Sequence, residues 1–165
     1  MTATYEKIAT TTLGSSSSTV TFSSISGSYT DLIVIITAKT SAAADVYVRC
    51  NSDSGTNYSY TGLSGSGSAA SSFRVSNTSN GMLLDNLGYA DNNNNQVIIV
   101  QFNNYSNTTT YKTSIARSNN AATGVDALVG LWRSTSAINE LTFRLNSTHT
   151  YSSGSTFTIY GIKSE

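Results

Sequence analysis

The sequence predicts an all-β protein: an antiparallel β-sandwich, jelly-roll-like, with about nine or ten short strands and almost no helix. Apolar and polar residues alternate in several segments, as at Leu141, Phe143 and Leu145, and a period of two places each set on one face of a strand. Proline is absent, and Ser, Thr, Asn and Gly fill the short connectors, which is typical of turns. No helical periodicity separates the strands, so a parallel α/β sheet is disfavoured.

Length and composition favour one domain over residues 1–165 with a single core, in which residues 1–18 form an N-terminal lead that contains an edge strand. Nine acidic and nine basic residues give a net charge of zero. Nucleic acid is therefore a poor partner, because phosphate binding needs a basic patch. The apolar runs are too short to cross a bilayer, and no signal peptide is visible. A single cysteine excludes an internal disulfide.

The first predicted strands cover residues 5–12, 19–23, 31–39 and 45–51. The third contains the continuous apolar run Leu32 to Ile36, which is typical of a central strand covered on both faces. Residues 51–72 are mostly Ser, Gly, Asn and Tyr, and predict an exposed loop with one short strand near Tyr58. Residues 73–75 form a short strand, and Asn80 and Gly81 a tight turn.

The second half of the chain begins with an ambiguous segment, since residues 82–87 fit either a strand or one helical turn. Residues 96–103 form a second central strand, and residues 110–117 return as a strand before a loop at 118–123. Three strands then follow between residues 124 and 162, with a polar hairpin loop at 146–155. The predicted core consists of Phe22, Ile33, Ile35, Val46, Val48, Val97, Ile99, Trp132, Leu141, Phe143, Leu145, Phe157 and Ile159.

Catalytic chemistry is not indicated by the residue pattern, so we expect neither an enzyme nor a cofactor. His149 is the single histidine and lies in a polar loop, and Cys50 continues an apolar face, as a small core residue does. The acidic residues are dispersed and show no paired carboxylates. Residues 51–57 loosely resemble a calcium loop but carry one carboxylate, Asp53, so capping of their own turns is the favoured interpretation and calcium stays open.

Tyrosine provides the one positive indication of binding. Exposed Tyr combines an apolar face with a polar tip, which suits protein interfaces and sugar stacking. The alternative is that these residues cover strand ends. The candidate partner-binding residues, all in or beside predicted loops, are Tyr58, Tyr60, Tyr89, Tyr105 and Tyr151.

The stretches GLWRSTSAINELTF and SSGSTFTIYGI resemble a group of small tailed-bacteriophage virion structural proteins, as do STVTFSSI, YTDLIVIITAK and VRCNSDSGTNYS. The resemblance runs from about residue 19 to residue 162. It implies a jelly-roll or related sandwich that serves as a capsid decoration (cement) protein or a tail-fibre module, commonly as a homotrimer. It also implies a protein made in the bacterial host cytoplasm and assembled into the virion.

Two functions follow from this resemblance. The first is a capsid decoration protein that stabilises the head by clamping neighbouring capsid subunits, since the chain shows no long fibrous repeat. The alternative is a tail-fibre or receptor-binding module that holds a host-surface glycan on Tyr- and Asn-rich loops. The expected partners are therefore phage capsid or tail proteins. Self-association is expected because exposed sheet edges need cover and charge is scarce.

Overall fold

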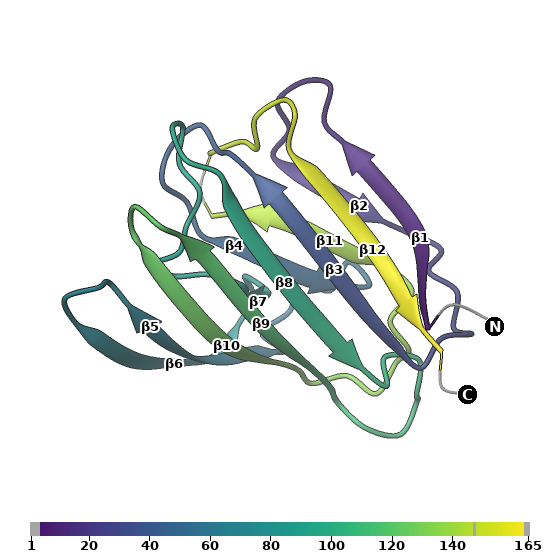
Figure 1. Ribbon diagram of the computed structural model, residues 1–165. Coiled ribbons are helices and arrows are strands. Elements are labelled where there is room, and N and C mark those ends of the chain that lie inside the picture. The colour runs from purple at the N-terminus through teal and green to yellow at the C-terminus, as the bar shows by residue number, and fades with distance from the viewer. Residues whose placement is uncertain (1–3, 147, 164–165) are drawn as a thin grey trace.

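The computed structural model describes residues 4–146 and 148–163, which form two antiparallel sheets packed face to face (Figure 1). No helix occurs among those residues. Three parts of the expected single domain lie outside the described residues: residues 1–3 of its lead, residue 147 of the predicted hairpin loop, and residues 164–165. The fold is the all-β antiparallel sandwich that the alternating pattern predicts.

The larger sheet contains eight strands, and the smaller sheet contains four. In spatial order, the larger sheet runs through β1 (Tyr5–Thr12), β12 (Thr156–Ile162), β3 (Asp31–Ala38), β8 (Gln96–Asn103), β9 (Lys112–Asn120), β10 (Gly124–Trp132), β5 (Tyr58–Gly65) and β6 (Ala70–Thr78). The smaller sheet runs through β2 (Thr19–Phe22), β11 (Leu141–Leu145), β4 (Val46–Cys50) and β7 (Met82–Leu83). In Figure 1 the smaller sheet passes behind the larger one, and the β5–β6 hairpin projects at the left.

The core lies between the two sheets and is built around aromatic rings. Phe143 on β11 contacts Phe22 and Phe157, with ring centroids 6.3 Å and 5.9 Å away. Tyr151 packs edge-on against Phe157 at 5.0 Å. Aromatic pairs in such geometries add to the stability that burial of their area provides. The following predicted core residues lie in this core: Phe22, Val46, Val48, Trp132, Leu141, Phe143, Leu145, Phe157 and Ile159.

Four predicted core residues were assigned to the wrong face of their strands. Ile35 is exposed, and Ile33, Val97 and Ile99 are half-buried. β3 and β8 are interior strands, but the smaller sheet covers only one of their faces. Their buried side chains are the alternate residues of the same runs, namely Leu32, Val34, Ile36, Ile98 and Val100. A continuous apolar run does not indicate which face of the strand is buried. For this reason the core positions were assigned to the wrong alternate residues.

Residues 4–146 and 148–163 form twelve strands, more than predicted, and the one short strand expected near Tyr58 is the start of a longer one. Residues 51–72 instead contain β5 and the start of β6, which pair as a hairpin. Gly62 on β5 allows this pairing to be close, since a Cβ there would lie 2.5 Å from the ring of Phe73. β7 resolves the ambiguous segment as a two-residue strand, and β9 extends three residues beyond the predicted end to Asn120.

Candidate interaction surface

The larger sheet has an inner face, toward the smaller sheet, and an outer face on the opposite side. Its strands also divide into a β12 half (β1, β12, β3 and β8) and a β10 half (β9, β10, β5 and β6). In the β10 half, large apolar residues are exposed on the outer face: Leu63, Ile115, Val125 and Val129 are 64%, 56%, 57% and 53% exposed. An exposed apolar group of this kind is more informative than a buried one, because such patches mark interaction sites.

Strand register brings these apolar residues together. Ile115 on β9 lies opposite Val129 on β10, and Val129 lies opposite Thr61 on β5. One row along the sheet, Ala127 lies opposite Leu63. Directly opposite side chains on one face of a sheet are about 5 Å apart, so they form a continuous apolar band. We call this band, Leu63, Ile115, Val125, Ala127 and Val129, the outer band.

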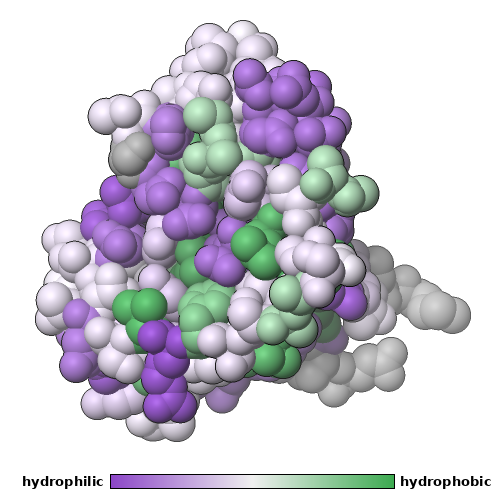
Figure 2. Space-filling model, turned by 90° about the vertical axis from the view of Figure 1, so that its left-hand side faces the viewer, coloured by the Kyte–Doolittle hydropathy of each residue, from purple (hydrophilic) through white to green (hydrophobic). Residues whose placement is uncertain are grey.

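The outer band borders a hollow in the outer face. This open trough has a volume of about 590 Å³. Its apolar lining includes Ile115, Val129 and Leu131, while Arg74 and Ser76 of β6 line its far side. Figure 2 views the molecule from the side that carries the β5–β6 hairpin and shows apolar residues near the middle of that side among polar ones. The trough is a concave surface whose lining combines these apolar side chains with hydroxyl groups, among them those of Ser59, Thr61 and Thr113.

Part of the inner face of the β10 half is polar. Its buried residues include Ser64, Ser114, Ser118, Asn120 and Asp126. Small residues are needed here because β7 approaches β10 closely: a Cβ at Gly130 would lie 2.8 Å from the Cβ of Met82. The positions beside β7 therefore hold small side chains, whereas Tyr58, Leu128 and Trp132 occupy other inner positions of the same half.

Asp126 organises this polar inner face. Its carboxylate accepts hydrogen bonds from Ser64 Oγ (2.6 Å) and Ser118 Oγ (2.9 Å) on the neighbouring strands. It also accepts from the backbone N–H groups of Asn86 (2.8 Å), Leu87 (3.1 Å) and Gly88 (2.7 Å). Burial raises the pKa of this carboxyl, but these donors outweigh burial and hold the pKa below its usual range. Asp126 thus fastens the β7–β8 loop to the β10 half.

A second buried carboxylate, Asp85, lies in the same loop and titrates differently. It accepts hydrogen bonds from the backbone N–H of Val46 (2.6 Å) and from Gln96 Nε2. Complete burial nevertheless raises its pKa well above the usual value, because desolvation disfavours the charged form. Among the residues described, Gln96 Oε1 is a buried acceptor without a hydrogen-bond partner. Both carboxylates are committed to holding the loop.

The predicted partner-binding tyrosines do not form a surface. Tyr58, Tyr105 and Tyr151 are fully buried and Tyr60 is nearly so, whereas Tyr89 is half-buried in the β7–β8 loop. Tyr58 stacks on Trp132, and its hydroxyl donates to Asp53 O at 3.0 Å. Burial contradicts the expectation for Tyr58, Tyr60, Tyr105 and Tyr151. The segments that seemed to be loops are strands or packed connections, so these rings contribute to the core.

The remaining sequence candidates also have structural roles. Asp53, the single carboxylate of the calcium-like loop, accepts from Trp132 Nε1 (2.7 Å), Asn57 Nδ2 (2.9 Å) and the Gly55 N–H (2.7 Å). Three donors directed at a carboxylate are characteristic of a turn and not of a cation site. Cys50 is fully buried, and burial raises the pKa of its thiol. Across residues 4–146 and 148–163, no group of three His, Cys, Asp or Glu side chains is placed to hold a metal ion.

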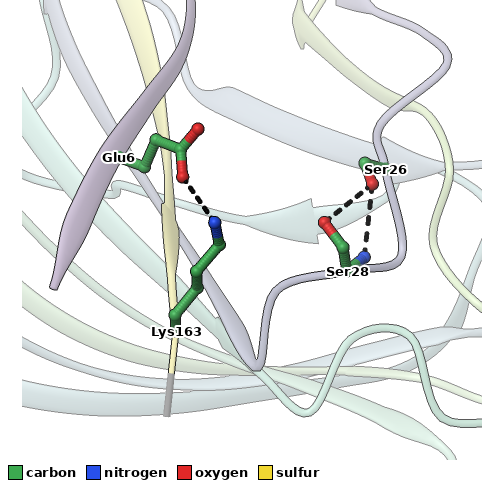
Figure 3. Close-up of polar contacts among 4 residues, drawn as sticks. All are labelled: Glu6, Ser26, Ser28 and Lys163. Atoms are coloured by element: carbon green, nitrogen blue, oxygen red, sulfur yellow. Dashed lines mark hydrogen bonds and ion pairs between the residues drawn. The ribbon is translucent and has the colours of Figure 1, made fainter. Parts of the chain in front are cut away.

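The two edges of the larger sheet differ in how they are protected. The β1 edge carries Glu6 and Lys7, and its register shifts between Lys7 and Ala9. Glu6 Oε2 is 2.9 Å from Lys163 Nζ, which joins β1 to the residue after β12; Figure 3 shows this pair beside the turn that the Ser26–Ser28 hydrogen bond closes. The β6 edge carries one charged residue, Arg74, along nine residues. Charges and bulges protect sheet edges. The β5–β6 register also shifts, between Tyr58 and Tyr60, so β6 is the less protected edge along residues 70–75, where its pairing is regular.

Comparison with known proteins gives no family assignment. No family model and no curated protein matches the chain. Similar solved structures include the galectin LEC-6 of Caenorhabditis elegans, with 12% identity and a TM-score of 0.39, covering 91% of this chain and 94% of the galectin. The alginate lyase Aly36B has 9% identity and a TM-score of 0.36, covering 93% and 77%. A marine PL-14 alginate lyase from Aplysia kurodai has 13% identity and a TM-score of 0.27, covering 84% and 70%. Similarities this distant carry no argument about this chain.

No helix in the part of the chain that the structure describes is long and apolar enough to cross a membrane. Sequence reasoning missed both the outer band and the Asp126 cluster. The available signal was the alternation over residues 124–132, where Val125, Ala127 and Val129 share one face and Asp126 and Gly130 share the other. Placing the glycine and the carboxylate inside requires knowledge of which element packs against them, and the sequence does not provide it.

Proposed function

We propose that this chain is a bacteriophage virion structural protein, a capsid decoration protein that stabilises the head by clamping neighbouring capsid subunits, and that it acts by binding and not by catalysis. The observation that supports this proposal is the outer band, a contiguous apolar surface on a rigid sheet. The resemblance of most of the chain to small tailed-phage virion proteins supplies the class of partner.

The outer band has the chemistry of a docking surface. Full burial of a Val, Leu or Ile side chain contributes about 1.5–3 kcal/mol relative to exposure, so removal of this band from water favours association. The band lies on strands that are hydrogen-bonded on both sides, which makes it preorganised. A preorganised surface loses little conformational entropy on binding, and this is what a clamp between capsid subunits requires.

Assembly as a homotrimer and location in the virion belong to the same proposal. The protein is synthesised in the bacterial cytoplasm and joins the head there. The glycan-binding alternative has less support, because four of the five tyrosines that motivated it are buried. The alternative nevertheless makes a distinct prediction, since a tail-fibre module binds host cells and leaves the head undecorated.

Imaging of virions that carry a tagged version of the chain tests the proposal. We expect density for the chain at repeated positions between capsid subunits, and reduced resistance of the heads to heat when the chain is missing. Density restricted to the tail, or saturable binding of the purified protein to host cells without binding to heads, would contradict it and favour the tail-fibre alternative.

A further inference from the structure

The free edge of β6 has an unused backbone. The hairpin that joins β5 to β6 is closed by the N–H of Ser66, which donates to Ala69 O at 2.9 Å. Bonded and unbonded pairs alternate along an antiparallel ladder. Counting from this pair, Ser72 (opposite Leu63) and Arg74 (opposite Thr61) occupy unbonded positions relative to β5. Their N–H and C=O groups therefore point away from the sheet, and both residues are exposed.

The charge beside this edge has one sign. On the outer face of β5, β6, β8, β9 and β10, the outward positions include Arg74 and Arg117 and no Asp or Glu. Neither arginine has an ion-pair partner among the residues described, where the single ion pair joins Lys163 to Glu6. Arg74 lies between the free edge and the trough, which it helps to line. A partner strand that pairs with this edge would neutralise the charge of Arg74 if it carried a carboxylate at that position.

We infer that β6 accepts an extended, acidic segment of a partner protein as an additional strand, with a carboxylate of that segment beside Arg74 at the rim of the trough. This inference rests on the proposed function in that the partner is a protein chain of the head. Main-chain hydrogen bonds at Ser72 and Arg74 supply affinity, and the outward side chains of the added strand supply specificity. Apolar side chains on the outer face of the added strand enlarge the apolar surface that the outer band forms.

An acidic heterologous segment complements Arg74, whereas a second copy of the chain offers no carboxylate on β6. Two β6 strands paired antiparallel about Arg74 would place the two guanidinium groups opposite each other, and like charges directly opposite are destabilising. The segment of β6 that would pair contains no acidic residue that could offset this repulsion. The β1 edge is disfavoured for any partner by Lys7, by the Glu6–Lys163 pair and by its register shift between Lys7 and Ala9. The register shift of β6 lies after Val75, outside the segment that would pair.

Binding of designed peptides to the full chain tests the inference. The probe is an N-acetylated hexapeptide of alternating Val and Thr in which one central Thr is Glu. Two controls replace this Glu by Gln or methylate alternate backbone nitrogens. Anisotropy of labelled peptides gives affinity, and amide exchange at Ser72 and Arg74 gives location. Loss of the charge pair should weaken binding about two- to fivefold, and backbone methylation should abolish it.

Two variants of the chain test the same site from the protein side. Ser72→Pro removes one outward N–H and is compatible with an edge strand, so we expect about a fivefold or greater loss of peptide affinity with an unchanged melting temperature. Arg74→Glu should weaken the acidic peptide and improve a lysine-containing one, whereas Lys7→Glu on the β1 edge is the matched control and should change neither. If Ser72→Pro impairs folding, the methylated peptide makes the same test.

The inference is overturned if the acidic peptide does not bind, if Ser72→Pro and methylation leave its affinity unchanged, or if sedimentation shows that wild-type chains dimerise through β6. Normal head binding by both variants also overturns it and leaves the capsid function standing. If the peptides behave as expected while no form of the chain binds heads, the strand site is supported and the capsid function fails.

Discussion

In β12 the large apolar side chains, Phe157 and Ile159, point toward the smaller sheet, whereas β9 and β10 also carry large apolar side chains, Ile115 and Val129, that point toward solvent. The strands have the same alternating pattern and belong to the same sheet. The difference comes from what covers the inner face. Where β7 and the following loop approach the β10 half, the inner positions are small or polar, as at Ser114, Asp126 and Gly130. Tyr58, Leu128 and Trp132 fill the rest of that inner face. The outer band is thus not required by the core, and we attribute it to binding.

Truncation of an inner residue in the β12 half should have the largest effect on stability. Phe157→Ala removes a fully buried ring that contacts Phe143 and Tyr151, and we expect the free energy of unfolding to fall by about 3–5 kcal/mol. Urea denaturation followed by tryptophan fluorescence measures it. A loss below 1 kcal/mol would mean that the two sheets do not pack around this ring.

Loss of the Asp126 carboxylate should be nearly as costly in the β10 half. Asp126→Ala leaves the Asn86, Leu87 and Gly88 N–H groups and two serine hydroxyls without their acceptor, and we expect a loss of about 2–4 kcal/mol. Ser64→Ala, which removes one donor, is the matched control and should cost about 1 kcal/mol. Equal effects of the two substitutions would contradict a central role for Asp126.

The pH dependence of stability should separate the two buried carboxylates. The folded-state pKa of Asp126 is lowered, so its contribution is present above the unfolded pKa of about 4 and is lost as the pH falls through the folded pKa. The folded-state pKa of Asp85 is raised, so its contribution is present below about pH 4 and declines as the pH rises toward the folded pKa. We expect denaturation measured from pH 3 to pH 8 to separate the two variants from the wild-type chain. The free energy of unfolding of Asp126→Asn should fall less than that of wild type as the pH is lowered. That of Asp85→Asn should fall less than that of wild type as the pH rises above about 4. Identical profiles would refute the assignment.

Truncation of an outer-band residue should have the smallest effect on stability. Ile115→Ala and Val129→Ala should change the free energy of unfolding by no more than about 0.5 kcal/mol, since both side chains are more than half exposed. Losses of about 2 kcal/mol or more, typical of core truncations, would mean that the β10 half buries these residues within the folded chain.

The sequence was sufficient for the fold class and for most strands, because alternation and turn residues are local signals. The sequence did not predict the features that depend on which face of a strand another element packs against. The run at Leu32 to Ile36 fits either face, so Ile33 and Ile35 were placed in the core that Leu32, Val34 and Ile36 occupy. Short strands near Tyr58 and at residues 73–75 were predicted, but the extent of the β5–β6 hairpin was missed because its serines and glycines match turn composition. Pairing of β5 with β10 and β6, and the Phe73 ring over Gly62, hold the hairpin extended. The Asp126 cluster depends on long-range contacts that no local pattern reveals.

The most direct test of the central claim is the affinity of outer-band variants for heads that lack the chain. Ile115→Asp and Val129→Asp place a charge in the proposed interface, and we expect binding to weaken by about a hundredfold or more while the melting temperature is preserved. Thr10→Asp, an exposed change on the outer face of the β12 half, should bind as wild type does. Unchanged binding by both outer-band variants would contradict the account.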